Sequence, residues 1–204
     1  MLKNPIAYEK CLEQVESVLA QKRSKNSNSD SNSLWFTLGE LDEMTLLYSV
    51  FWETLRLKQE IYSARIVTSD FVFNPKDTRK FLVQKGTRII ACPTLVHYDP
   101  EIFDNPHEFQ YDRFQDVSVT KNGKPLVNYV KPFGGGGHLC SGRKFITYET
   151  MAILAMMLSR LELRLAPEEE TLANVGVDYS RQGIGVLPPT RDPILEFRRR
   201  EPPC

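Results

Sequence analysis

PFGGGGHLCSGRKF, at residues 132–145, is the stretch of this 204-residue sequence that decides its fold. A single cysteine, Cys140, stands there between four consecutive glycines and an apolar segment that predicts a helix from about Gly142 to Leu161. The positive end of a helix dipole and the free N–H groups of the first turn stabilise a thiolate. Glycines also let a flat group lie against the backbone. The loop therefore predicts a thiolate beside a planar group.

Three other interpretations of this loop stay open on its own residues. A phosphate-binding loop needs GxxxxGK followed by Ser or Thr, and Gly137 to Lys144 comes close without placing the lysine or the hydroxyl correctly. A catalytic cysteine needs a histidine base, and His138 lies two residues from Cys140 but has no evident orienting carboxylate. A glycine linker beside a structural cysteine is the ordinary alternative. The choice depends on the rest of the chain.

The bulk composition excludes several classes of function. Basic and acidic residues number 26 each, so no net field favours nucleic acid or an anionic membrane surface. No apolar run approaches the roughly 20 residues of a membrane-spanning helix, and the N-terminus lacks the apolar region of a signal peptide. As written, the chain is expected to be soluble and intracellular. The four cysteines are scattered, which predicts neither a disulfide framework nor structural zinc.

Two helices are predicted before the loop. Residues 6–20 place Ala7, Cys11, Val15 and Val18 at helical spacing, and helical periodicity resumes from Thr37 to about Arg56. Between them, Ser24 to Ser33 is polar and of low complexity, which predicts a flexible surface loop.

The rest of the chain predicts a small sheet, an irregular segment and terminal strands. The β-rich pieces lie between Ile61 and Ile90, and the irregular segment from His97 to Pro132 is too long for a plain connector. Two short strands, near Ile184–Leu187 and Ile194–Phe197, follow the apolar helix. This order of elements predicts the α+β class.

The cysteine loop resembles a known cofactor-binding signature. Phe133, Gly136, His138, Cys140 and Gly142 have the spacing of the haem-thiolate motif of the cytochrome P450 superfamily. The resemblance implies that Cys140 is the axial ligand of the iron of haem b, where its electron density favours O–O cleavage. It also implies that Phe133 shields the sulfur and that His138 pairs with a haem propionate.

Charged residues outside the loop extend the resemblance. Glu53 and Arg56 share one helical face at i,i+3 spacing, which alone is typical of a solvated surface pair, but they match the family's Glu-x-x-Arg motif. Arg113, in the segment FQYDRF at 109–114, matches the arginine of the family's meander and implies a buried Glu53–Arg56–Arg113 network. Arg65 falls where the family has a strand arginine directed at a propionate.

The sequence departs from the common family pattern at two positions. Ser141 stands where a small apolar residue or proline is usual and would add a hydrogen-bond donor near the sulfur, and Tyr111 replaces a proline. The subgroup with such a tyrosine, which includes prostacyclin synthase and the bile-acid-pathway sterol hydroxylases, is the one that the sequence resembles most. The resemblance also implies substrate contacts from the apolar turns at 61–64 and 183–186.

The function implied is that of a haem-thiolate monooxygenase. Residues 1–204 resemble a partial P450 domain that lacks the family's N-terminal anchor and its distal oxygen-activating helix, so the catalytic distal residues are unknown. The expected substrate is hydrophobic, sterol-like or polycyclic, and the expected electron donor is an NADPH-dependent reductase. Alternatives are a peroxide isomerase of the prostacyclin-synthase type and a non-catalytic haem-binding fragment. A full-length form is expected at the endoplasmic reticulum membrane, held only by the missing anchor.

Overall fold

The computed structural model describes residues 1–25, 35–75, 79–116, 118–170, 176–181 and 184–200. Residues 26–33 of the stretch that was expected to form a polar surface loop lie outside these ranges. The described residues combine helices with short antiparallel ladders, so the predicted α+β class is confirmed. None of the helices in the described ranges has both the length and the apolar character that a membrane crossing needs.

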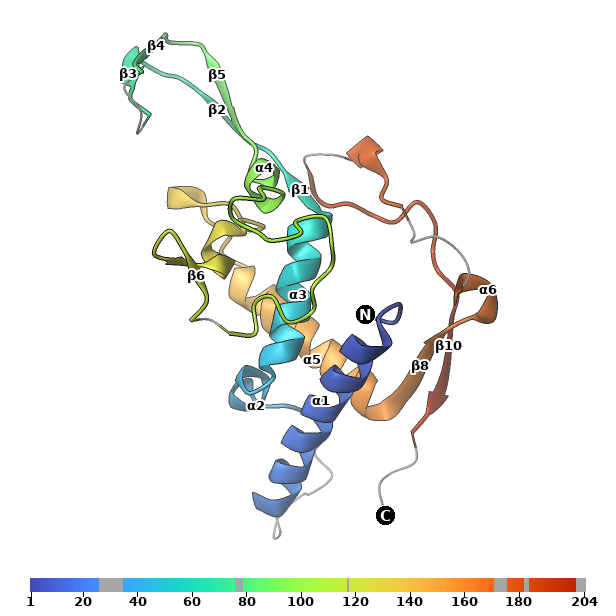
Figure 1. Ribbon diagram of the computed structural model, residues 1–204. Helices are drawn as coiled ribbons and strands as arrows, with labels where there is room; N and C mark the ends of the chain where they lie inside the picture. The colour runs from blue at the N-terminus through green and yellow to red at the C-terminus, as the bar shows by residue number, and fades with distance from the viewer. Residues whose placement is uncertain (26–34, 76–78, 117, 171–175, 182–183, 201–204) are drawn as a thin grey trace.

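Three helices form the body of the molecule: α1 (Pro5–Lys25), α3 (Thr45–Lys58) and α5 (Arg143–Arg160). They lie side by side in Figure 1, and each contacts the other two. The apolar positions of α1 predicted from helical spacing, Ala7, Cys11, Val15 and Val18, are all buried. From α3 and α5 the core receives Leu47, Val50, Met151, Ala155 and Leu158. This helical core carries the site described below.

The single helix predicted from Thr37 to about Arg56 is two helices, α2 (Leu38–Asp42) and α3, so this boundary was wrong. The chain turns at Met44, whose N–H donates to the Leu41 carbonyl at 3.0 Å, and the turn buries both side chains. Gln14 of α1 then caps the restarted helix, because its Oε1 accepts the N–H groups of Leu46 and Leu47. This tertiary cap satisfies donors that a continuous helix would have satisfied itself.

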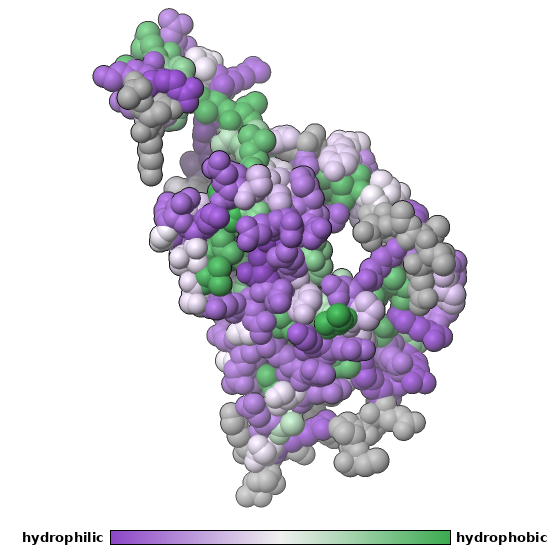
Figure 2. Space-filling model, viewed as in Figure 1, coloured by the Kyte–Doolittle hydropathy of each residue, from purple (hydrophilic) through white to green (hydrophobic). Residues whose placement is uncertain are grey.

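The predicted small sheet is present as separate two-stranded ladders. The strands after α3 are β1 (Gln59–Ile61), β2 (Ser63–Ile66), β3 (Phe71–Phe73), β4 (Phe81–Val83) and β5 (Arg88–Ala91). Antiparallel pairing of β2 with β5 and of β3 with β4 makes an arm that projects from the helices in Figure 1. Apolar side chains lie on its surface, as Figure 2 shows, and Ile66, Leu82 and Ile90 are each more than 60% exposed.

The irregular segment crosses α3 and leads into the cysteine loop. It begins at the end of α4 (Thr94–His97) and contains the short strands β6 (Thr120–Lys121) and β7 (Lys124–Pro125) and the 3-10 turn η1 (Leu126–Tyr129). A second 3-10 turn, η2 (Gly136–His138), lies in the cysteine loop that follows. Phe103, Phe114 and Val130 form its own buried cluster, against which Trp52 of α3 packs. The segment is therefore held against α3 by apolar contacts as well as by the polar ones below.

The C-terminal part contains β8 (Leu161–Leu165), α6 (Pro167–Glu170), η3 (Tyr179–Arg181), β9 (Ile184–Val186) and β10 (Leu195–Arg199). The last two correspond to the two short strands predicted from the sequence. β10 pairs with β8, which the sequence interpretation had assigned in part to the end of the preceding helix. β9 pairs with β1, and this pairing brings the C-terminal part back beside the end of α3.

Candidate functional site

A buried ion-pair network lies at the middle of α3. The Glu53 carboxylate accepts two hydrogen bonds from the Arg56 guanidinium, at 2.7 and 2.8 Å, and one from Arg113 Nε at 3.1 Å. Glu53 also accepts the backbone N–H of Gln110 at 3.1 Å. Glu53 and Arg56 are both 0% exposed. The structure thus brings together the three charged residues singled out from the sequence, and it buries them.

Arg56 connects this network to the irregular segment. Its Nη1 donates to the carbonyls of His97 and Pro106, at 2.7 and 2.6 Å, and its Nη2 donates to the Glu108 carbonyl at 3.3 Å. Arg56 therefore uses its guanidinium to hold the ends of the 97–108 stretch while Glu53 neutralises the charge. A lysine has a single ammonium group and could not donate hydrogen bonds in all of these directions at once, as the planar guanidinium does.

Arg113 holds the same stretch from its other side. Its Nη1 donates to the Asp104 carbonyl at 2.8 Å. The guanidinium carbon lies over the ring of Phe103, 5.9 Å from the ring centroid. The next residue, Phe114, has its N–H bonded to the buried hydroxyl of Ser49 on α3 at 2.8 Å. The first half of the irregular segment, from His97 to Phe114, is therefore fixed to α3 at several points.

Two further buried side chains tie the start of the cysteine loop to this framework. His97 Nε2 accepts the N–H of Lys131 at 3.0 Å, and Gln59 Nε2 donates to the carbonyl of Pro132. Both side chains are less than 10% exposed. Burial, together with the charge of Arg56, lowers the pKa of His97 to about 4, so its imidazole is neutral and can accept this bond.

The cysteine loop closes on itself just before α5. The N–H of Cys140 donates to the carbonyl of Phe133 at 3.0 Å, and Gly134 and Gly136 adopt φ values of 75° and 65°. These left-handed conformations are open to glycine and strained for other residues. Gly142 is the N-cap of α5, and the Cys140 side chain is exposed. The backbone thus places a free thiol directly before the helix N-terminus.

The surroundings of this thiol fit a large flat group such as haem. A Cβ added at Gly135, Gly136 or Gly137 would meet no atom within 4 Å, so the space beside this backbone is open. Leu139 and Ile146, on either side of Cys140, are each 40% exposed and offer apolar contact. An exposed cysteine sulfur next to apolar residues and open glycine backbone is a donor set suited to haem iron.

The two cationic residues expected at the propionates lie at different places. His138 ends η2 in the cysteine loop and is exposed. Arg65 lies on β2 of the arm, is exposed, and donates from Nη1 to the carbonyl of its neighbour Ala64 at 2.8 Å. Both guanidinium and imidazole groups are thus accessible to an anionic partner.

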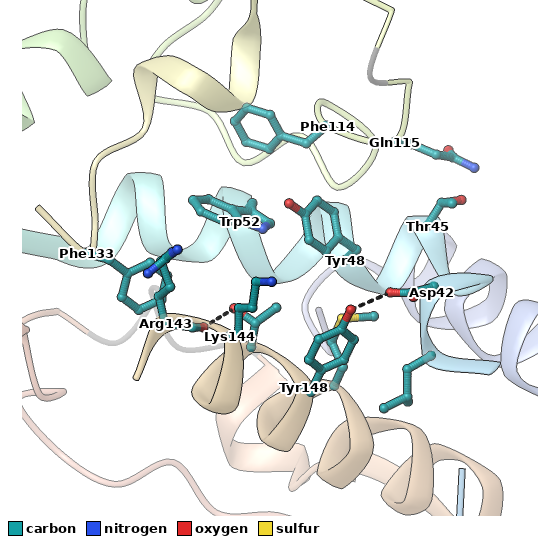
Figure 3. Close-up of a pocket in the computed structure, with 13 residues that line it drawn as sticks. Asp42, Thr45, Tyr48, Trp52, Phe114, Gln115, Phe133, Arg143, Lys144 and Tyr148 are labelled. Carbon is teal, nitrogen blue, oxygen red and sulfur yellow. Dashed lines mark hydrogen bonds between the residues drawn. The ribbon is translucent and has the colours of Figure 1, made fainter. Parts of the chain in front are cut away.

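Phe133 links the loop to α3 through aromatic packing. Its ring meets Trp52 edge to face, with centroids 6.0 Å apart. Both rings line a cavity of about 440 Å³ between α2, α3, α5 and residues 114–115 of the irregular segment. In Figure 3, Lys144 and Tyr148 of α5 lie across from Trp52, and Arg143 lies beside Phe133. Cys140 is not among the residues that line this cavity.

The two apolar turns that were expected to contact substrate come together in the structure. β1 and β9 pair so that Ile61 lies opposite Ile184 and Glu60 opposite Gly185. Residue 183 of the second turn lies outside the described residues.

Sequence reasoning missed three polar residues that position the loop and the meander: Ser49, Gln59 and His97. Each is buried and bonds a backbone group at least 34 residues away. The only sign of a buried role in the sequence was a polar residue at the edge of an apolar pattern. Such residues are also common on exposed surfaces, so the pattern did not single them out.

Comparison with known proteins agrees with the motifs. The sequence model of the family described as "Cytochrome P450" matches residues 1–189. Among curated proteins, "Cytochrome P450 7A1" of Sus scrofa is 33% identical over 97% of this chain and 39% of its own length. "7-alpha-hydroxycholest-4-en-3-one 12-alpha-hydroxylase" of Homo sapiens is 32% identical over 97% and 40%.

A third relative, "Prostacyclin synthase" of Rattus norvegicus, is 32% identical over 78% of this chain and 33% of its own length. The chain therefore spans about two fifths of the length of the first two of these relatives and about a third of the third.

Proposed function

Because the chain belongs to the cytochrome P450 family, we propose that it carries the haem-binding part of a haem-thiolate monooxygenase, with Cys140 as the axial ligand of the iron. The observation that supports this most is the closed loop itself. The bond between the Cys140 N–H and the Phe133 carbonyl holds an exposed thiol before α5, beside glycine backbone with open space around it. The glycine linker and the phosphate loop explain neither the exposed thiol nor the buried network behind it.

The residues around Cys140 have separate parts in holding haem b. Leu139 and Ile146 would offer apolar contact to the group, since both are partly exposed beside the loop, and Phe133 would shield the sulfur from water. His138 and Arg65 would pair with the propionates, since both side chains are exposed and can donate hydrogen bonds to a carboxylate. Haem supplies the one-electron and O₂ chemistry that amino-acid side chains lack.

We further propose a hydrophobic substrate of the sterol type and an NADPH-dependent reductase as electron donor. The support is that relatives at about 32% identity carry the names "Cholesterol 7-alpha-monooxygenase" and "7-alpha-hydroxycholest-4-en-3-one 12-alpha-hydroxylase". The turns at 61–64 and 183–186 are the part of this chain that the resemblance assigns to substrate contact, and the strands β1 and β9 at these turns pair.

The test of the ligand is the absorption spectrum of the haem-reconstituted protein, reduced and exposed to carbon monoxide. Thiolate ligation shifts the Soret band to longer wavelength, and Cys140→Ser is expected to abolish that shift. Cys92→Ser is the matched control, because Cys92 is also a free cysteine but lies outside the loop. If Cys140→Ser retains the shifted band, the ligand assignment is wrong.

A peroxide isomerase is the second candidate, and the match to "Prostacyclin synthase" over 78% of the chain favours it. Such an enzyme rearranges its peroxide without electrons from a reductase. Conversion of an organic endoperoxide by reconstituted protein without reductase or NADPH would therefore favour the isomerase. Sterol hydroxylation that depends on reductase would favour the monooxygenase, and haem binding without either reaction would identify a non-catalytic fragment.

A further inference from the structure

His97 is a buried side chain that the proposed function leaves without a part. It is 1% exposed and ends α4, far in sequence from Cys140. Its Nε2 accepts the Lys131 N–H, so this nitrogen carries a lone pair and the proton of the neutral ring is on Nδ1. Nδ1 has no partner among the described residues. A buried donor without a partner is uncommon in folded proteins, so the ring orientation favours the Nε2 bond even though Nδ1 goes unpaired among these residues.

The backbone of the same residue belongs to the ion-pair network. The His97 carbonyl accepts Arg56 Nη1 at 2.7 Å, and Arg56 is fixed by Glu53. One residue thus receives a bond from the network on its main chain and holds the cysteine loop with its side chain. Gln59, the first residue after α3, adds a parallel tie through the Pro132 carbonyl.

These bonds end next to the residue that holds Cys140. Lys131 and Pro132 immediately precede Phe133, whose carbonyl accepts the Cys140 N–H at 3.0 Å. Lys131 also accepts the N–H of Gly134 through its own carbonyl at 3.2 Å. If the Lys131 peptide shifts, the Phe133 carbonyl must shift with it, and the Cys140 N–H loses its acceptor.

We infer that His97 is a positioning residue that holds the Cys140 thiol in place through the Lys131 to Phe133 backbone. Apart from the turn of its own helix, the hydrogen bonds of His97 within the described residues go to Lys131 and Arg56, and it has no hydrogen bond to the thiol. An effect of His97 on iron ligation rests on the proposed function, because the position of the Cys140 thiol matters to the iron only if Cys140 is the ligand. The coupling between His97 and the Cys140 backbone does not depend on that assignment.

The first experiment measures amide hydrogen exchange of the chain without haem. His97→Asn places its amide at the position of Nδ1 and cannot reach Lys131, whereas His97→Gln places Oε1 near the position of Nε2 and keeps an acceptor. In His97→Asn, the Lys131 and Cys140 amides are expected to exchange at least about tenfold faster, while core amides of α3 keep their rates. His97→Gln is expected to restore most of the protection at both positions.

His107→Asn is the matched control. His107 is an exposed histidine that stacks on Tyr98, ten residues from His97, and it has no bond to the loop. Its variant is expected to leave both amides unchanged. Faster exchange at Lys131 with unchanged exchange at Cys140, in either His97 variant, overturns the inference. This criterion compares two amides within one protein and needs a folded variant that has lost the bond to Lys131. If His97→Asn does not fold, His97→Phe, which keeps a ring at this position but has no acceptor, is judged by the same criterion.

The second experiment adds haem and separates this inference from the proposed function. In the reduced carbon monoxide complex, part of the long-wavelength Soret band of His97→Asn is expected to be replaced by the shorter-wavelength band of a neutral thiol ligand. His97→Gln is expected to keep the long-wavelength band. A wild-type protein without the long-wavelength band refutes the ligand role of Cys140 and leaves the exchange result standing. If His97→Asn has a normal long-wavelength Soret band although its Cys140 amide exchanges faster, the backbone coupling does not determine how the iron is ligated. That result overturns the positioning role of His97.

Discussion

Replacing Glu53 by alanine removes the acceptor of four hydrogen bonds in a site that is 0% exposed. Two of these come from Arg56, one from Arg113 and one from the Gln110 N–H. Arg56 would then keep its positive charge in a buried position with carbonyl partners only. Breaking a buried pair by removing one partner costs roughly 3–5 kcal/mol. Because a domain has only about 5–15 kcal/mol of stability, this loss is expected to unfold much of the protein or to prevent haem incorporation.

The assay is urea denaturation followed by circular dichroism, with haem content measured on the same preparations. Glu53→Gln keeps the packing and one acceptor oxygen, so it is expected to lie between wild type and Glu53→Ala. Glu13→Ala is the control, since Glu13 is exposed on α1, and surface substitutions usually change stability by less than about 0.5 kcal/mol. A Glu53→Ala protein within about 1 kcal/mol of wild type, with normal haem content, would refute the argument that the network is paired and buried.

Three further changes are expected to have measurable effects. Ser49→Ala leaves the Phe114 N–H without its buried acceptor and should cost about 1–3 kcal/mol in urea denaturation, a loss whose absence would mean that water replaces the hydroxyl. The pKa of His97 is lowered to about 4 by burial and by the Arg56 charge, so the unfolded chain binds the extra proton. Stability should therefore fall by up to about 3 kcal/mol between pH 6.5 and pH 4, and less in His97→Gln; equal pH dependence in both proteins would contradict this. Thr37→Ala removes the capping box of α2 and should cost about 1 kcal/mol in thermal unfolding, whereas an unchanged midpoint would show that α2 is held by packing alone.

The charged network could be anticipated because part of its geometry is local. Glu53 and Arg56 are neighbours on any helix, whatever surrounds them. Their burial and the arrival of Arg113 depend on how the meander crosses α3, which no local pattern specifies. His97 shows the limit more sharply, since a lone histidine at the end of a four-residue helix carries no sign that its partner is 34 residues later.

Tertiary contacts also determine the secondary structure of two segments that local sequence patterns did not predict correctly. Leu161 to Leu165 reads LELRL, which continues the preceding apolar helix as readily as it starts a strand. It is a strand because Leu195 to Arg199 returns beside it with five paired residues. In the same way, the break between α2 and α3 is fixed by Gln14 of another helix, and neither proline nor glycine marks it.

The support of Cys140 is one-sided, and this separates two properties that a haem site normally combines. On the protein side, the position of the thiol is fixed by buried polar residues of this chain, from Glu53 through His97 to the Phe133 carbonyl. On the open side, Leu139, Phe145 and Ile146 expose between 40% and 69% of their surface. Ligand geometry depends on the first set of contacts, whereas the hydrophobic part of haem affinity depends on how far the second set is buried. His97→Asn should therefore alter how Cys140 ligates the iron, with little effect on the affinity for haem. A change at Leu139, Phe145 or Ile146 should lower the affinity for haem, with little effect on how Cys140 ligates the iron.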